Sequence, residues 1–127
     1  MKTQALPAHP DKTSPASAAV RILMQSDTGG MIHSTLRPYQ ITKAVCHVSV
    51  NEFWFILSGE GEIWRKEGSY EEITTLTAGI TVDIAKGTHF QYRNTGSETF
   101  KFICVTMPPW SGHQESSYVK GYWQPTK

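Results

Sequence analysis

The chain has 127 residues, a length typical of one domain that can bury its own core without disulfide bonds. Twelve Lys and Arg residues against eleven Asp and Glu residues give a formal net charge of +1, with no block of like charges. This balance argues against nucleic acid as a partner, because phosphate backbones attract strongly basic faces. No secretory signal or membrane-spanning apolar stretch is visible, so we expect a cytoplasmic protein with reduced cysteines and no membrane partner.

The first nineteen residues differ from the rest. Three prolines (Pro7, Pro10 and Pro15) stand among small residues, without any periodic apolar pattern. Such a segment buries too little surface to offset the entropy lost on ordering. We therefore expect residues 1–19 to form a flexible N-terminal arm, or an arm that orders only against a partner subunit. A folded domain over residues 20–110 and a tail over residues 111–127 follow.

From Val20 onward, short apolar runs rich in β-branched and aromatic residues alternate with glycine-containing turns. No window of helical length carries an uninterrupted apolar stripe with a helical period. The sequence therefore predicts short strands over these runs: 20–24, 31–36, 42–50, 53–57, 62–65, 72–76, 80–84, 90–93 and 99–106. Antiparallel strands in this number most naturally close as a double-sheet jelly-roll barrel, so the predicted fold class is all-β.

Two segments carry residues at informative spacings. In the first, Glu52 follows His47 by five residues, and Gly59 follows Glu52 by seven. In the second, running from Gly79 to Asn94, a further glycine stands at position 87. Together these segments resemble the two sequence motifs of the cupin superfamily, and the resemblance covers about residues 35–109. It implies a double-stranded β-helix barrel with a pocket inside.

The resemblance also implies a metal site that this sequence does not complete. Metal-binding cupins use two histidines and a glutamate from the first motif and one histidine from the second. Here Val45 and Phe90 occupy two of the histidine positions, so only His47 and Glu52 remain. Because transition metals usually need three or four well-placed donors, we expect no tightly bound metal and name no certain cofactor.

A divalent metal with an unusual ligand set remains an alternative. It would use His47, Glu52 and one further donor, of which His89 is the nearest. Strand alternation points His89 away from the face of Phe90, unless a bulge inverts it. His33 and Gln91 are the other candidate donors.

His47 and Glu52 also have an interpretation without metal. Alternation puts Val45, His47 and Ser49 on one face, which the resemblance implies is the barrel interior. A buried carboxylate is costly unless it is paired, and an adjacent imidazole favours the charged forms of both groups. We therefore predict a pair that acts as catalytic acid and base. The alternative is a purely structural ion pair.

Around this pair, inward-facing apolar side chains predict a flat-walled pocket suited to a ring-bearing or hydrophobic small molecule. The same side chains would equally serve to fill a small barrel. The residues expected to line the pocket are Val45, Trp54, Ile56, Phe90, Tyr92, Cys104 and Thr106.

After the last predicted strand, Pro108 and Pro109 cannot continue a sheet ladder. Aromatic residues return at Tyr118, Tyr122 and Trp123, so we expect the tail to pack over the barrel mouth or onto a second subunit.

The resemblance implies homodimers and a wide range of activities, among them isomerases, cyclases, dioxygenases, storage proteins and sensory domains. The fold therefore does not select a reaction. We expect a homodimeric protein that binds a small organic ligand, either as an isomerase-like or cyclase-like enzyme using His47 and Glu52 or as a non-catalytic binding or sensing domain. A metal-dependent enzyme is the third hypothesis.

Overall fold

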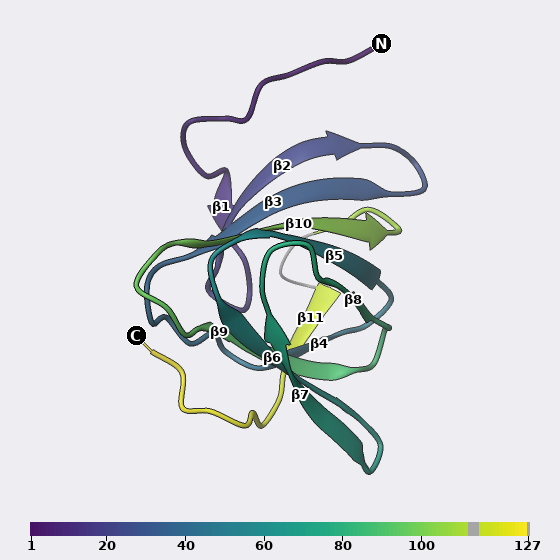
Figure 1. Ribbon diagram of the computed structural model, residues 1–127. Helices are drawn as coiled ribbons and strands as arrows, with labels where there is room; N and C mark the ends of the chain where they lie inside the picture. Colours follow the sequence, from purple (N-terminus) through teal and green to yellow (C-terminus); the bar gives the residue numbers. More distant parts are fainter. Residues whose placement is uncertain (112–114, 127) are drawn as a thin grey trace.

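The computed structural model describes residues 1–111 and 115–126 (Figure 1). No α-helix occurs in these two segments, so none of the described chain forms a helix long and apolar enough to cross a membrane. The strands are β1 (Lys12–Thr13), β2 (Ala19–Gln25), β3 (Gly30–Leu36), β4 (Val45–His47), β5 (Asn51–Ser58), β6 (Gly61–Glu67), β7 (Tyr70–Leu76), β8 (Thr81–Ile84), β9 (His89–Asn94), β10 (Phe100–Met107) and β11 (Ser116–Tyr118).

Two antiparallel sheets form the barrel (Figure 1). The six-stranded sheet has the order β1-β2-β3-β10-β5-β8, and the five-stranded sheet has the order β11-β4-β9-β6-β7. Strands that follow one another in sequence, such as β4 and β5, often lie in opposite sheets, as a jelly roll requires. The predicted all-β, double-sheet barrel is confirmed.

Strand alternation decides which side chains reach the interior. Along β5, Glu52, Trp54 and Ile56 are buried, while Phe53 and Phe55 between them are exposed. The interior is rich in aromatic rings, and Trp54 stacks on Phe102 of β10 with 4.0 Å between ring centroids. Every second residue along the central strands therefore contributes to the core or to the walls of the functional site.

The glycine turn after β5 fixes the start of β6. Gly59 has a φ of +89°, and a Cβ atom there would lie 2.9 Å from the carbonyl oxygen of Thr99. At Gly61 a Cβ atom would lie 2.6 Å from the carbonyl oxygen of Arg93. Both positions exclude larger residues, which explains the glycines in the first sequence motif.

The run expected as one strand over residues 42–50 is shorter in the structure, where only Val45–His47 is a strand. Beyond it the chain bends, and the backbone N–H of Ser49 donates to the carboxylate of Glu115 at 2.6 Å. Ser49 is therefore exposed and does not face the interior as strand alternation predicted.

The N-terminal segment, expected as a flexible arm over residues 1–19, contributes to the barrel wall. β1 pairs with β2, and Ala16 and Ala18 are buried. The side chain of Arg21 also donates to the carbonyl oxygen of Pro7 at 2.7 Å. Small residues and Pro15 thus pack closely against the sheet. The segment has no periodic apolar pattern, so the sequence did not predict this packing.

The tail expected over residues 111–127 packs on its own barrel, although its residues 112–114 and 127 lie outside the described chain. β11 adds to the edge of the five-stranded sheet beside β4. Further on, the backbone N–H of Val119 donates to the carbonyl oxygen of Ala44 at 3.1 Å, and that of Thr126 donates to the carbonyl oxygen of Ile41. The folded unit therefore extends past residue 110.

Candidate functional site

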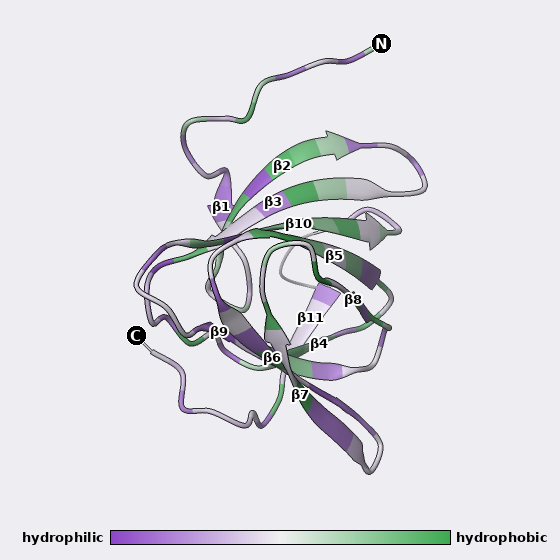
Figure 2. Cartoon of the chain, viewed as in Figure 1, coloured by the Kyte–Doolittle hydropathy of each residue, from purple (hydrophilic) through white to green (hydrophobic). Residues whose placement is uncertain are grey.

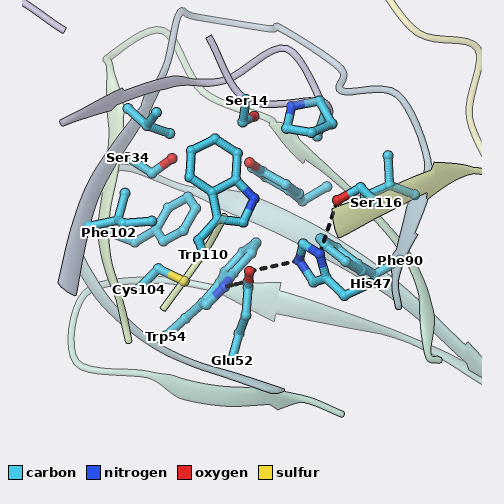
Figure 3. A pocket seen from close by; sticks show the side chains of 16 residues that line it. Ser14, Ser34, His47, Glu52, Trp54, Phe90, Phe102, Cys104, Trp110 and Ser116 are labelled. Atoms are coloured by element: carbon cyan, nitrogen blue, oxygen red, sulfur yellow. Dashed lines mark hydrogen bonds and ion pairs between the residues drawn. The ribbon is translucent and has the colours of Figure 1, made fainter. Parts of the chain in front are cut away.

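A small cavity of about 50 Å³ lies between the two sheets (Figure 3). Its walls are mainly apolar and aromatic, with a few polar groups. The lining residues are Ser14, Pro15, Ala16, Val20, Ile32, Ser34, Val45, His47, Glu52, Trp54, Phe90, Tyr92, Phe102, Cys104, Trp110 and Ser116. Both sheets, the N-terminal segment and the C-terminal tail thus contribute to a single site.

His47 and Glu52 meet in this cavity, as the sequence predicted. His47 ends β4 in one sheet, Glu52 lies near the start of β5 in the other, and a short bend joins them. The Nε2 atom of His47 lies 2.7 Å from Oε2 of Glu52 (Figure 3). At this distance the two side chains form a close ion pair when the imidazole is protonated.

Each member of the pair has a second partner. The Oγ atom of Ser116 lies 3.0 Å from Nδ1 of His47, and the indole N–H of Trp54 donates to Oε1 of Glu52 at 2.8 Å. The thiol of Cys104 also interacts with the Glu52 carboxylate. Because both ionisable groups are less than a tenth exposed, these contacts replace the water that each would otherwise bind.

The surroundings favour the charged forms of the pair. Burial alone would lower the pKa of His47, but the close contact with Glu52 and the charges of Glu52 and Glu115 outweigh it and raise that pKa. Burial alone would raise the pKa of Glu52, but His47, together with the donors on Trp54 and Cys104, lowers it. At neutral pH the site therefore holds a carboxylate beside an imidazole whose protonated form is stabilised.

Cys104 is a neutral thiol in this setting. Burial and the adjacent charge of Glu52 raise its pKa well above the usual value, which opposes formation of the thiolate. A nucleophilic cysteine needs the opposite environment. Cys104 is therefore a polarisable wall of the cavity.

A second polar group lies around the hydroxyl of Tyr92, which interacts with the hydroxyls of Ser34 and Ser14. Burial, followed by the charge of Glu52, raises the pKa of Tyr92, so its hydroxyl stays protonated. In Figure 3, Ser14 and Ser34 lie on the opposite side of the cavity from Glu52. The apolar walls thus separate a charged side from a neutral, hydroxyl-bearing side.

Trp110 and residues 14–16 form one part of the cavity wall. The backbone N–H of Trp110 donates to Oγ1 of Thr106 at 3.2 Å, and the Lys12 ammonium lies 5.0 Å from the indole ring centroid. Figure 3 shows the Trp110 indole across the cavity from Trp54. Trp110 belongs to no strand, yet it is buried within the hydrophobic core.

Most of the predicted pocket residues lie where alternation placed them. Val45, Trp54, Phe90, Tyr92 and Cys104 line the cavity. Ile56 and Thr106 are fully buried, as inward-facing residues should be, but they are not among the lining residues. These two residues lie in the core beyond the cavity. Strand alternation predicts whether a side chain points inward, but not how far along the barrel axis it lies.

The donors present do not fit a metal ion. Val45 and the Phe90 ring, whose centroid is 5.3 Å from that of His47, stand at two of the positions that hold ligands in metal-binding relatives. Within residues 1–111 and 115–126, no three His, Cys, Asp or Glu side chains come together as a metal site. His47 and Glu52 instead face each other at 2.7 Å, as partners in an ion pair.

The other proposed donors lie outside the cavity. His89 is half-buried and pairs in register with Cys46 and Lys66. The amide of Gln91 donates to the carbonyl oxygens of Thr42 and Trp123 on the outer side of its sheet. His33 is buried, with an Nδ1 atom that has no hydrogen-bond partner, and strand alternation puts it on the face opposite the lining residues Ile32 and Ser34.

Nine lining residues were not predicted from the sequence: the apolar Pro15, Ala16, Val20, Ile32 and Phe102, and four that carry a polar group, Ser14, Ser34, Trp110 and Ser116. The four polar ones are the more informative. Three of them belong to segments with no strand periodicity or to a strand of only three residues. Ser34 is the exception, since it alternates with Ile32 on β3 and the inward face of that strand could have identified it.

The family model of the cupin domain matches residues 33–106, more than half of the chain. The chain belongs to the cupin family. This match confirms the family indicated by the two sequence motifs and agrees with the double-sheet barrel. A search of curated proteins gives no match.

Several solved structures share this cupin fold. One is an uncharacterised conserved protein with a double-stranded β-helix domain from Klebsiella pneumoniae, with a TM-score of 0.68 and 21% identity over 87% of this chain and 90% of that one. Drosophila melanogaster CENP-C, solved bound to CAL1, has a TM-score of 0.65 and 14% identity over 71% and 74% of the two chains. Lactobacillus farciminis oxalate decarboxylase has a TM-score of 0.72 and 16% identity, over 90% of this chain but 33% of the enzyme. At these identities the likeness shows the fold alone.

Proposed function

We propose that this cupin binds a small ring-bearing organic molecule in the cavity between its sheets, with the His47–Glu52 pair facing the ligand. The observation that carries the proposal is a charged pair less than a tenth exposed in a cavity otherwise walled by aromatic rings. Apolar walls with a few convergent polar groups are typical of sites for small organic ligands.

The ligand must be small or must move part of the wall. The cavity of about 50 Å³ has room for a few water molecules, whereas most ligand pockets measure roughly 300–1,000 Å³. Trp110 lines the cavity from a segment that belongs to no strand, and we propose that it is the part of the wall that moves. We propose that a planar ring enters by taking the place of the Trp110 indole.

The charged pair can move protons in a complete cycle. Glu52 as carboxylate removes a proton from the ligand, and protonated His47 donates one to another ligand atom. The pair is then neutral, and transfer of the proton from Glu52 to His47 across their 2.7 Å contact restores it. No external oxidant or cosubstrate is needed, so the chemistry that fits is an isomerisation or cyclisation.

Ser116 has a positioning role in this proposal. When Glu52 holds a proton on Nε2 of His47, Nδ1 of the neutral imidazole accepts a hydrogen bond from the Ser116 hydroxyl. When His47 is protonated, the same nitrogen donates to the serine oxygen. The ring orientation is therefore maintained in both protonation states.

A binding or sensing role without turnover is the second candidate. One observation favours it: Nδ1 of His47 and Oε1 of Glu52 already have protein partners. A ligand could then be held by the aromatic walls alone. In that case, Glu52→Gln and His47→Asn would leave affinity nearly unchanged and no substrate would turn over.

Ligand-observed NMR with a panel of phenols and indoles tests the binding proposal. Wild-type protein is expected to bind members of the panel, and Val45→Phe, which fills the cavity, is expected to lose them. Val48→Phe on the exposed bend is the matched control, since Val48 is 64% exposed. Binding that survives Val45→Phe, or no binding to wild type or to Trp110→Ala, would contradict the proposal.

The proposed location is the reducing cytoplasm, where the free thiols Cys46 and Cys104 remain reduced. The partner that we propose besides the small ligand is a second copy of the chain, because Phe53, Phe55 and Leu57 leave an apolar surface exposed on β5.

A further inference from the structure

The wall of the cavity carries no net charge. Of the described residues that line it, only His47 and Glu52 are charged near neutral pH, and their opposite charges cancel. Cys104 and Tyr92 stay protonated, because burial and the charge of Glu52 raise the pKa of each. The rest of the lining is neutral and mainly apolar, as the hydropathy of the surrounding strands in Figure 2 also shows. A charged ligand would therefore enter a site without a free counterion, which is costly.

The charged side of the cavity offers a hydrogen-bond acceptor. The Glu52 carboxylate accepts from the indole N–H of Trp54 at 2.8 Å, and its Oε2 atom lies 2.7 Å from Nε2 of His47. The thiol of Cys104 is a third partner. An ionised carboxylate has about four acceptor positions, so one remains for a ligand. Because that position can only accept, the ligand group that meets Glu52 must carry an O–H or N–H.

The hydroxyl-bearing side offers a donor. The Oγ atom of Ser14 accepts from the backbone N–H of Ala18 at 3.1 Å, which leaves the hydroxyl proton of Ser14 for Tyr92. Burial is the main influence on the pKa of Tyr92 and raises it, whereas Ser34 and Ser14 lower it, as donors to the phenol oxygen do. Since its oxygen accepts from two serines, the Tyr92 hydroxyl can direct its own proton into the cavity that it lines.

The two sides lie at opposite ends of the space that a ring would fill. In the view of Figure 3, Ser14 and Ser34 lie on one side of the cavity and Glu52 on the other, with the Trp110 indole between them. A planar ring that takes the place of this indole would have the carboxylate at one edge. At the opposite edge it would meet the hydroxyl of Tyr92, the partner of both serines.

We propose that the ligand is an uncharged ring compound with a hydrogen-bond donor at one end and an acceptor, such as a carbonyl oxygen, at the other. The donor binds the Glu52 carboxylate, and the acceptor receives the proton of the Tyr92 hydroxyl. Tyr92 is then a specificity-determining residue, because a ligand without the acceptor leaves its buried O–H unpaired. This inference rests on the binding proposed above and adds the chemical class of the ligand.

Ligand-observed NMR of the wild-type protein with four matched probes tests the inference. The probe para-hydroxyacetophenone has both ends, para-ethylphenol lacks the acceptor, acetophenone lacks the donor, and para-hydroxybenzoate carries a negative charge. We expect para-hydroxyacetophenone to bind at least about tenfold more tightly than each of the others, because each of them leaves a buried polar group or a charge unpaired.

The variant Tyr92→Phe locates the acceptor preference, since it removes one hydroxyl and keeps the ring. We expect the affinities of para-hydroxyacetophenone and para-ethylphenol to come within about twofold of each other in this variant, because the donor to the carbonyl oxygen is gone. Tyr39→Phe is the matched control, since Tyr39 is 61% exposed and does not line the cavity. The control is expected to keep the wild-type preference.

The outcomes separate this inference from the proposed function. If para-ethylphenol or acetophenone bound wild-type protein as tightly as para-hydroxyacetophenone, or if the preference survived Tyr92→Phe, the inference would be overturned while binding of a small ring still stood. Tighter binding of para-hydroxybenzoate would also overturn it, since it would show that a cation such as Lys12, which lies over the Trp110 ring, reaches the ligand. Binding of none of the four probes, to wild type or to Trp110→Ala, would contradict both proposals.

Discussion

The two faces of the six-stranded sheet invert the usual distribution of polar and apolar groups. The inner face carries an ionised carboxylate, Glu52, and a polar thiol, Cys104, among aromatic rings. On the outer face the same strand, β5, exposes Phe53 and Phe55. A chain selected only for stability as a monomer would bury the rings and expose the carboxylate.

The difference is the one expected if the inner face serves the ligand binding proposed above. A buried ion pair recovers its desolvation cost only with well-placed partners, and replacement by apolar residues is often neutral or stabilising. The exposed rings forgo the stabilisation that their burial would give.

The largest predicted effect comes from removing half of the buried pair. His47→Ala leaves the Glu52 carboxylate without its counterion, so the free energy of unfolding is expected to fall by about 3–5 kcal/mol. His89→Ala, at a half-buried histidine on β9 that does not line the cavity, is the matched control and is expected to change stability by less than about 1 kcal/mol. Urea denaturation of both variants measures this, and equal losses would show that the pair has no special role.

Adjacent residues on β5 compare the two faces directly. Ile56, fully buried, is expected to lose about 2–5 kcal/mol of stability on substitution by alanine. Leu57, 40% exposed, is expected to lose less than about 1 kcal/mol when the chain is monomeric. Denaturation at low protein concentration makes the comparison. A larger loss at Leu57 would mean that the outer face is covered within the single chain.

The pH dependence of stability separates the two buried histidines. Because the pKa of His47 is higher in the folded state than its unfolded value of 6.5, protonation of His47 stabilises the fold. This stabilisation is fully present below pH 6.5 and is lost as the pH rises through the folded-state pKa. The lowered pKa of Glu52 adds stability that is complete above its unfolded value of 4.5 and is lost as pH falls through the folded pKa. The pair therefore contributes most between pH 4.5 and 6.5. Thermal denaturation of Glu52→Gln is expected to show a smaller advantage in that window.

The contribution of His33, on the outer face, to stability depends on pH in the opposite direction. Burial, followed by the charges of Arg21 and Lys101, lowers its pKa, so its contribution is complete above its unfolded value of 6.5 and is lost as pH falls through the folded pKa. His33→Asn is expected to become relatively more stable than wild type below that pH. If His33→Asn and Glu52→Gln shifted the pH profile of stability in the same direction, the contrast between the two faces would be wrong.

The smallest predicted effect is a difference between the two thiols in their rate of alkylation by iodoacetamide. Cys104 lies in the cavity with a raised pKa, whereas Cys46 is half-buried and alternates to the other side of its strand. Because the thiolate is the reacting species, Cys46 is expected to be labelled first. Mass spectrometry of partly labelled protein measures the order. Faster labelling of Cys104 would reveal an activated thiol.

Much of this arrangement is predictable from local sequence rules. Period-two alternation correctly directs Glu52, Trp54, Phe90 and Tyr92 inward, and the steric need for glycine at position 59 fixes the turn that follows. These features depend on neighbouring residues, so the sequence carries them plainly.

What could not be predicted depends on contacts between segments far apart in the chain. Ser116 reaches His47 from a three-residue strand sixty-nine positions away, and Trp110 enters from a segment without periodicity. Ser49 turns outward because Glu115 binds its backbone N–H, a contact that alternation cannot anticipate.

The central claim, a charged imidazole–carboxylate pair inside the barrel, is tested most directly by an NMR titration of the His47 ring. The His47 resonances are assigned by comparison with His47→Asn. We predict a pKa above the ordinary 6.5 in the wild-type protein and a lower pKa in Glu52→Gln, because the carboxylate is the main group that stabilises the protonated ring. A His47 pKa at or below 6.5, unchanged by Glu52→Gln, would contradict the account.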